Sequence, residues 1–304
     1  TAIAVVLYEH ANVYLDRDND YNTRTDYYYR IKILDKKAFD RANITIDLYK
    51  KKEVKDIKAI TYNITDDGKM TKSFLSKENI FTVDKSENWS SCKFTLPNVK
   101  EGSVIEYNYS IISPYLGIND WSFQSDIPKI KSDFDASILG NYKYKISIVG
   151  NLPLDRKESS INKKCVYIDG LGDGACAIYS FGMNDIPAFK EEDYMLSKKN
   201  YMSRLAFDLE SYTSTSGVID KYTTNWKTVD KQLKNIFFNK QTSKKTFFKK
   251  NIPEHILSIE NTLEKAKKIY TFIQNHYTWN GRYWNNKDEK VKQAFNNKSG
   301  TAGE

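Results

Sequence analysis

Residues 97–128, with the sequence PNVKEGSVIEYNYSIISPYLGINDWSFQSDIP, constrain the fold more than any other stretch of the chain. After an opening turn, side chains alternate between apolar and polar with period two, which predicts a strand with one buried face. The strand ends before Pro114, and we expect Trp121 and Phe123 to anchor the segment that follows, up to the breaker at Pro128. The side chains expected on the buried face are Ile105, Tyr107, Tyr109 and Ile111.

Short runs of the same kind recur through the first two thirds of the chain, in which tyrosine is abundant and proline is scarce. Tyrosine and β-branched residues favour half-buried strands. The runs at 89–96 and 104–112 are predicted to pair antiparallel across the intervening turn. Many short strands without intervening helices predict a mainly β fold, an antiparallel β-sandwich-like domain. The expected strands are 2–7, 12–15, 27–34, 44–48, 60–64, 70–75, 89–96, 104–112, 142–149, 165–168, 175–181 and 205–209.

A glycine-rich segment, Gly170-Leu-Gly-Asp-Gly174, has the composition of a phosphate-binding loop. It lacks the Gly-Lys-Ser/Thr ending of such a loop, and a strand follows it rather than a helix. Glycines supply the positive φ angles that hairpin turns need. The segment is therefore predicted to be a hairpin turn between two strands.

The chain changes character after Ser211, where a small polar segment predicts a linker at residues 213–225. Helical periodicity starts at Trp226, with Thr228 as the expected N-cap. The sequence therefore predicts a β-sandwich-like domain over residues 1–212, the linker, and a small α-helical segment over residues 226–304.

The strongest helical pattern begins at Asn261, and Glu264 three residues later completes a capping-box-like start. One apolar face of this helix is predicted, and His276 falls at its C-terminal end, where a cation suits the helix dipole. We interpret His276 as a helix-end or partly packed residue. The predicted apolar face consists of Leu263, Ala266, Tyr270, Ile273 and Tyr277.

The formal net charge of +8 would suit an anionic partner such as nucleic acid, anionic lipid or acidic glycan. The lysines are spread along the whole chain beside Asp and Glu, however, and this is typical of a solvated surface. We therefore do not expect nucleic acid as a partner. No apolar run approaches the roughly 20 residues of a membrane span, so no transmembrane segment is expected.

The three cysteines, Cys92, Cys165 and Cys176, form no CxxC pair, and none of the three histidines has a partner at metal-ligand spacing. We predict no metal and no cofactor. A disulfide between Cys165 and Cys176 could join two neighbouring strands; the alternative, commoner for buried cysteines, is that all three remain free thiols.

Three aromatic residues follow the strongest helix and are the candidate binding residues of the chain: Trp279, Tyr283 and Trp284. Rigid amphipathic rings supply contact area at low entropic cost, so they could line a groove for a glycan or a peptide. The alternative is that they pack under a neighbouring part of the protein.

Several of these motifs occur in the same order in a known group. The chain resembles the domain of unknown function that precedes transglutaminase-like domains in secreted or envelope proteins of Bacteroidetes-type bacteria, followed by the helical beginning of such a transglutaminase-like domain. The resemblance covers almost the whole chain, and its first two segments together are fairly specific. The segments that carry it are GSVIEYNY (102–109), WSFQSDIP (121–128), SPY (113–115), IPAF and EEDYM (186–195), the Trp226 helix and KAKKIYTFIQNHYTWN (265–280).

The resemblance implies a catalytic cysteine that opens a core helix in a pattern like Gly-x-Cys-x-Asp. The matching positions here are residues 300–304, and Ala302 stands where the nucleophile is expected. A thiolate attacks an acyl carbonyl while histidine acts as the base, and alanine can act neither as the nucleophile nor as the base. No catalytic residue is therefore assigned, and the expectation is that this chain is not an enzyme.

Two functions remain open on this basis. The first is a non-catalytic binding or interaction module of a secreted, periplasmic or envelope-associated protein, with a glycan, a peptide or an envelope protein as its ligand. The alternative is the substrate-presenting N-terminal part of a transglutaminase-like cysteine peptidase or acyltransferase. This location is implied by the resemblance alone, because the sequence shows no signal peptide that would indicate it.

Overall fold

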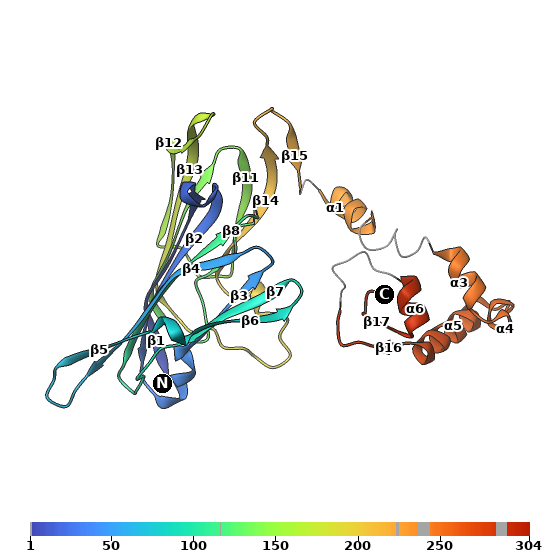
Figure 1. Ribbon diagram of the computed structural model, residues 1–304, viewed down its shortest axis with the longest axis horizontal. Helices are drawn as coiled ribbons and strands as arrows, with labels where there is room; N and C mark the ends of the chain where they lie inside the picture. Colours follow the sequence, from blue (N-terminus) through green and yellow to red (C-terminus); the bar gives the residue numbers. More distant parts are fainter. Residues whose placement is uncertain (1, 116, 223–224, 236–243, 284–290) are drawn as a thin grey trace. The chain divides into compact units, whose positions relative to one another are not determined.

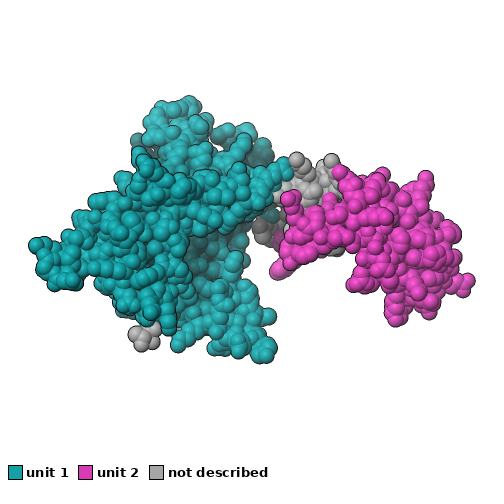
Figure 2. Space-filling view, turned by 60° about the horizontal axis from the view of Figure 1, so that its bottom comes forward, with its two compact units in different colours: residues 1–222 teal, residues 223–304 magenta. Residues whose placement is uncertain are grey.

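The computed structural model describes residues 2–115, 117–222, 225–235, 244–283 and 291–304 (Figure 1). The chain divides into two compact units, unit 1 (Thr1–Tyr222) and unit 2 (Thr223–Glu304) (Figure 2). Strands in several sheets make up most of unit 1, whereas unit 2 consists mainly of short helices. The prediction of a mainly β chain followed by a helical segment is confirmed.

Unit 1 is built on one large sheet with the strand order β12-β13-β10-β1-β2-β8-β4-β5. All neighbouring strands in it pair antiparallel except β1 and β10, which are parallel. The predicted runs 2–7 and 12–15 are parts of the single long strand β1. The strands are β1 (Ala4–Asp16), β2 (Asn22–Ile33), β4 (Glu53–Ile64), β5 (Met70–Phe74), β8 (Val104–Ser113), β10 (Lys129–Leu139), β12 (Arg156–Ile168) and β13 (Gly172–Ile186).

Two smaller sheets complete unit 1. The first has the order β3-β7-β6, with β3 (Asn43–Tyr49), β6 (Ile80–Ser86) and β7 (Trp89–Thr95). The second contains β9 (Trp121–Ser122), β11 (Tyr142–Val149), β14 (Arg204–Thr213) and β15 (Ile219–Lys221). The strand β15 lies within the segment expected to be a linker, and it pairs with β14. Short 3-10 helices are η1 (Arg17–Asn19), η2 (Lys36–Ala42), η3 (Lys77–Asn79) and η4 (Lys198–Asn200).

The predicted pairing of residues 89–96 with 104–112 is wrong. β7 pairs with β3 and β6 in a small sheet, whereas β8 pairs with β2 and β4 in the large sheet. The connection is fixed at both ends, because the Leu96 amide donates to the Ala42 carbonyl and the Gly102 amide to the Ile33 carbonyl. The chain therefore crosses from one sheet to the other at this turn, and alternation alone could not distinguish the two arrangements.

One face of the large sheet is covered by both smaller sheets, through two hydrophobic clusters. The first joins Ile33 and Ile105 of the large sheet to Leu48 and Phe94 of the β3-β7-β6 sheet. The second joins residues such as Phe134 to Leu205 of β14. The four side chains predicted on the inner face of β8 belong to this layer, where Ile105, Tyr107 and Ile111 are buried and Tyr109 is half-buried.

A stack of tyrosine rings connects the two clusters, because two of its members, Tyr27 and Tyr29, pack against both. Tyr27 lies opposite Tyr109 and Tyr29 opposite Tyr107 in the β2–β8 ladder, with ring centroids 5.0 and 4.9 Å apart. The indole of Trp121 lies 6.4 Å from both Tyr27 and Tyr29. Such offset aromatic pairs add to the free energy gained from burying the rings. Trp121 is buried, which confirms its expected role as an anchor.

A buried ion pair lies beside this stack. Glu9 and Lys129 are only 4% and 5% exposed, and the Lys129 ammonium donates to Glu9 Oε1 at 2.5 Å. Ser132 Oγ donates to the same carboxylate oxygen, and Trp121 Nε1 donates to Ser132 Oγ. Burial raises the pKa of Glu9, and the contacts with Lys129 and Ser132 oppose this shift. The pair therefore connects β1, β10 and the anchor Trp121 in one hydrogen-bonded group.

The structure joins Cys165 and Cys176 in a disulfide, the less favoured of the two alternatives that the sequence left open. It links β12 to β13 where their ladder slips between Asn162 and Val166. The glycine-rich segment is the hairpin turn between these strands, as predicted, with positive φ at Gly170 and Gly172. Cys92 is a buried free thiol.

Unit 2 contains short helices and one two-stranded parallel sheet. The predicted N-cap of its first helix is displaced by three residues, since the side chain of Asn225, not Thr228, accepts from a backbone amide there. The cap of the strongest helix is confirmed, because Asn261 Oδ1 accepts from the amides of Leu263 and Glu264. The elements are α1 (Trp226–Leu233), α3 (Lys245–Asn251), α4 (Glu254–Leu257), α5 (Thr262–His276), β16 (Thr278–Trp279), α6 (Val291–Asn297) and β17 (Ser299–Gly300).

The packing face of α5 differs in part from the predicted one. Leu263 and Tyr270 are 66% and 69% exposed within the described chain, whereas the predicted Ile273 and Tyr277 are half-buried. Phe272 and His276 also pack, and their rings contact Phe295 of α6, as the Tyr277 ring does. Because α5 carries apolar residues on two sides, periodicity alone could not select the side that is buried.

The buried pair predicts an asymmetric response to mutation. Lys129→Met should lower the free energy of unfolding of the unit 1 transition by about 3–5 kcal/mol, because it leaves the Glu9 carboxylate buried without its counter-charge. The double variant Glu9→Leu/Lys129→Met should recover most of this loss, since no charge then remains buried. Urea denaturation followed by tryptophan fluorescence would measure both.

Lys145→Met is a matched control, since Lys145 is an exposed lysine of β11. It should change the free energy of unfolding by less than about 0.5 kcal/mol. Equal destabilisation by Lys129→Met and the double variant would contradict the assigned role of the pair.

The tyrosine stack predicts alkaline unfolding. Burial raises the pKa of Tyr27, Tyr29, Tyr107 and Tyr109 above 10. Their neutral forms therefore contribute stability that is fully present below about pH 10. This stability is lost as the pH rises above 10, because only the unfolded chain then releases these protons. Stability against pH, together with tyrosinate absorbance, would show ionisation of the stack coinciding with unfolding.

The variant Tyr109→Phe should reduce the slope of stability against pH above pH 10 by about 1.4 kcal/mol per pH unit, the value for one proton. Tyr194→Phe should leave it unchanged, because Tyr194 is fully exposed. Ionisation of the stacked rings at pH 10 without loss of structure would contradict this account.

Candidate functional site

The candidate residues predicted near the end of the chain lie on two adjacent segments of unit 2. β16 pairs parallel with β17, with Thr278 opposite Ser299 and Trp279 opposite Gly300. The ladder continues beyond the strands, because the amides of Ala302 and Gly303 donate to the carbonyls of Arg282 and Tyr283 at 3.0 and 3.1 Å. The structure thus brings the aromatic segment beside Ala302, although neither the spacing nor the periodicity of the sequence indicated this contact.

Two of the three predicted groove residues form an exposed aromatic pair. The rings of Trp279 and Tyr283 are 5.6 Å apart in a T-shaped arrangement, and the side chains are 56% and 68% exposed. The indole Nε1 of Trp279 donates to the Arg282 carbonyl at 2.8 Å, which fixes the ring. Trp284 lies outside the described residues. Within the described chain these two rings are not packed under another element.

Residues 301–304 carry the hydrogen-bond pattern of a capping box, although their backbone is not helical. The Glu304 amide donates to Thr301 Oγ1 at 3.2 Å, and the Thr301 amide donates to Glu304 Oε2 at 2.9 Å. In a capping box, a Thr and a Glu three residues later satisfy each other's amides in this reciprocal way. Ala302 directly follows the capping Thr301. The Thr-x-x-Glu spacing is visible in the sequence, but it was not predicted to form a capping box.

The backbone around Ala302 is closely packed and fully bonded. A Cβ on Gly300 would lie 3.1 Å from both Ala294 Cβ and Glu304 Oε2, so the site requires a glycine or a shift of its neighbours. The amides of residues 301–304 all donate within the chain. This turn therefore offers no free amide for an oxyanion, and the Ala302 side chain offers no nucleophile.

His276, at the end of α5, has a packing role, as the sequence indicated. His276 Nε2 lies 2.8 Å from the Phe295 carbonyl, which can only accept, so this nitrogen carries the proton. The imidazole stacks on the Phe295 ring with centroids 4.1 Å apart. Glu304 has a different neighbour, Tyr277, whose pKa is raised by burial and by that carboxylate. The hydrogen-bonding of His276 is thus structural and does not connect it to Ala302.

The described residues contain no group of His, Cys, Asp or Glu side chains arranged to hold a metal ion. In the same part of the chain, no helix is long and apolar enough to cross a membrane. Residues 240–250, which contain five lysines, lie partly outside the described residues, and residues 245–250 belong to α3.

Comparison with solved structures gives a match across the whole chain. A putative protease from Parabacteroides distasonis ATCC 8503 superimposes with a TM-score of 0.66 at 14% sequence identity, covering 99% of this chain. This chain spans 56% of that structure's length. At this identity the match shows a shared fold. No family model matches the chain, and no curated protein matches it.

Two further structures match with low scores. They are native leukotriene A4 hydrolase from Saccharomyces cerevisiae, with a TM-score of 0.31 at 12% identity, and Legionella pneumophila aminopeptidase A in complex with aspartic acid, with 0.30 at 11%. They cover 68% and 72% of this chain, and the chain spans 30% and 23% of their lengths. These scores are too low to support an argument about the fold.

The match to the Parabacteroides distasonis structure corrects one expectation. The prediction that the chain is not an enzyme, made from alanine at position 302, is contradicted, since the solved structure that shares the fold is a putative protease. Alanine at one position shows only that position 302 cannot supply a nucleophile. The predicted domain of unknown function has no matching family model to support it.

Proposed function

We propose that this chain is the N-terminal part of a transglutaminase-like cysteine peptidase or acyltransferase, in which unit 1 is a sandwich-like domain that presents substrate. The observation that carries the proposal is the shared fold with the Parabacteroides distasonis putative protease over 99% of the chain. The chain spans 56% of that structure, so the proposal concerns the activity of a longer protein. Sheet-on-sheet packing in unit 1 supports the domain assignment.

Ala302 has no nucleophilic atom. We therefore place the attacking thiolate of the proposed enzyme at another position of the longer protein.

The exposed pair Trp279 and Tyr283 favours a binding role for this part of unit 2. The two rings belong to a segment whose backbone is hydrogen-bonded to the segment of Ala302 and Gly303. We propose that the pair contacts the ligand, with a peptide as the ligand expected of a peptidase; a glycan and an envelope protein are the other classes that such rings suit.

Activity should be measured on the complete protein encoded by the gene, with casein peptides for hydrolysis and a glutaminyl peptide plus an amine for transfer. We expect turnover that iodoacetamide abolishes. Trp279→Ala should raise KM about fivefold with a smaller change in kcat, because it removes one aromatic contact worth about 1 kcal/mol. Trp226→Ala should leave both constants unchanged, since Trp226 is an exposed residue of α1.

The variant Ala302→Cys tests the position of the nucleophile. Turnover by the protein with Ala302 would agree with a thiolate elsewhere. If turnover appears only with cysteine at 302, the nucleophile position is 302 and the proposal of a thiolate elsewhere is wrong. An absence of turnover in both proteins would contradict the enzymatic proposal as a whole.

We also propose a location outside the cytoplasm, in the periplasm, the envelope or the medium. The supporting observation is the disulfide Cys165–Cys176, because disulfides persist in oxidising compartments and are rare in the cytosol. Cell fractionation with immunodetection should recover the protein outside the cytoplasmic fraction, with these two thiols protected from alkylation. Recovery only in the cytoplasmic fraction, with reactive thiols, would contradict this location.

A further inference from the structure

The large sheet of unit 1 has a second face, opposite the two hydrophobic clusters, and this face carries polar side chains. Pairing of β1, β2, β8 and β4 brings His10, Tyr28, Asn108 and Lys58 into one row. Over this row lies a hollow of about 400 Å³, also lined by Asp26 and Asp56. Such a volume lies within the usual range of small-ligand sites.

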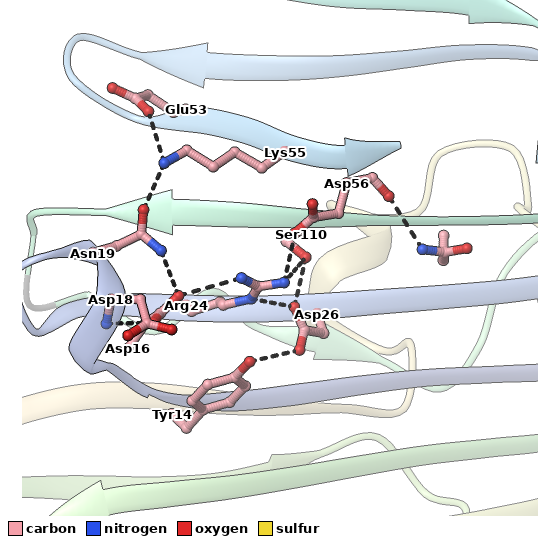
Figure 3. A network of polar contacts seen from close by, with 11 residues as sticks. Tyr14, Asp16, Asp18, Asn19, Arg24, Asp26, Glu53, Lys55, Asp56 and Ser110 are labelled. Atoms are coloured by element: carbon pink, nitrogen blue, oxygen red, sulfur yellow. Dashed lines mark hydrogen bonds and ion pairs between the residues drawn. The ribbon is translucent and has the colours of Figure 1, made fainter. Parts of the chain in front are cut away.

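The acidic wall of the hollow is organised around one guanidinium, that of Arg24 (Figure 3). Arg24 Nε donates to Asp26 at 2.7 Å, NH1 lies 3.3 Å from Asp16, and NH2 donates to Asp56 at 2.7 Å. Ser110 Oγ and the Tyr14 hydroxyl also donate to Asp26. These bonds fix the carboxylates over the sheet and leave the second oxygen of Asp56 without a partner in the described chain.

This wall carries an excess of negative charge. Three carboxylates surround the Arg24 guanidinium, which leaves a formal charge of −2 at neutral pH, and two of them, Asp26 and Asp56, line the hollow. Asp16 lies behind them in the network; burial would raise its pKa, but hydrogen bonds from Asn19 and Arg24 outweigh burial and hold this pKa below its ordinary value. The most accessible of the three is Asp56, whose side chain is 56% exposed, against 38% for Asp26. A ligand cation would therefore meet Asp56.

A positive charge also lines the hollow, that of Lys58, which follows Asp56 by two residues along β4. Lys58 is exposed and has no hydrogen-bond or ion-pair partner among the residues that the structure describes. The β4–β8 ladder slips between Lys55 and Lys58, and Asp56 adopts a positive φ of 56° in this bulge. Bulges re-aim side chains. Here, an acidic and a basic side chain line the same hollow without pairing with each other.

We propose that this hollow binds a short zwitterionic peptide, with its ammonium group at Asp56 and its carboxylate at Lys58. Two residues of a chain span at most about 7 Å, and an extended dipeptide has about the same length. His10 and Asn108 also line the hollow; His10 Nε2 is bonded to Asp135, and Asn108 Nδ2 donates to the Asp56 carbonyl. This inference goes beyond the proposed enzymatic function and does not depend on it, because it concerns binding by unit 1 alone.

Charge complementarity distinguishes this ligand from other occupants. A metal ion would use only the carboxylates and would leave Lys58 without a role, and the described residues offer no metal-binding group. A phosphate would meet the excess negative charge around Arg24. A neutral saccharide would use neither Asp56 nor Lys58 as a charge. Only a ligand that carries a positive and a negative charge can pair with Asp56 and Lys58 at the same time.

The test is calorimetric titration of the 304-residue chain with the dipeptide Ala-Ala, with N-acetyl-Ala-Ala, which lacks the ammonium, and with Ala-Ala-amide, which lacks the carboxylate. Ala-Ala should bind with Kd on the order of tens of millimolar, the affinity that two solvent-exposed ion pairs can supply. Each blocked peptide should bind about fivefold more weakly, the effect of one exposed ion pair. Equal affinity of the three peptides, or no heat from Ala-Ala, would overturn the proposal.

Two variants assign each end of the peptide. With Lys58→Met, Ala-Ala and Ala-Ala-amide should bind equally, while the effect of N-acetylation persists. With Asp56→Asn, the reverse is expected. The matched controls Lys93→Met and Asp84→Asn change exposed charges on the β3-β7-β6 sheet and should leave all three affinities unchanged. A change in affinity with the controls as large as with the Lys58 and Asp56 variants would place the peptide elsewhere and overturn the assignment.

Discussion

The buried contact between Glu9 and Lys129 is the interaction on which the architecture of unit 1 depends. It joins the N-terminal strand β1 to β10 at the start of their parallel ladder, and through Ser132 it fixes the indole of Trp121. That indole lies against the tyrosine stack between the two hydrophobic clusters. Charges so deeply buried are tolerated only when each is paired and hydrogen-bonded. Their geometry therefore specifies one arrangement of the layers.

Local features of this fold could be predicted from the sequence. The alternation in β8 identified the inner face correctly, because period two leaves no choice once one face is apolar. Partners of strands could not be predicted in the same way. β10 escaped notice although Phe134, Ala136 and Ile138 alternate along it, since charged residues interrupt the run. The predicted pairing of β7 was wrong for a related reason. After a turn, the next strand can pair with the strand before it or enter another sheet, and the same alternation of side chains fits both arrangements.

In unit 2 the limits were of a different kind. The N-cap of α5 was predicted because its signal is local. Its buried side was predicted only in part, since apolar residues lie on two sides and tertiary contacts with Phe295 select among them. Two of the predicted binding residues, Trp279 and Tyr283, are exposed as a groove would require. Their position beside Ala302 depends on a parallel pairing that only the structure provides. The charged pair at Asp56 and Lys58 was not predicted, because its exposure results from a bulge.

The parallel pairing of β1 with β10 also affects how this protein is made. Glu9 and Lys129 are 120 positions apart, and β1 is a central strand of the large sheet. A chain that emerges from the ribosome at about 5–20 residues per second exposes its first strand for several seconds before β10 is available. Contacts over such sequence separations also slow folding after synthesis. During this interval the backbone groups on that edge of β1 have no partner strand and are open to pairing with other chains.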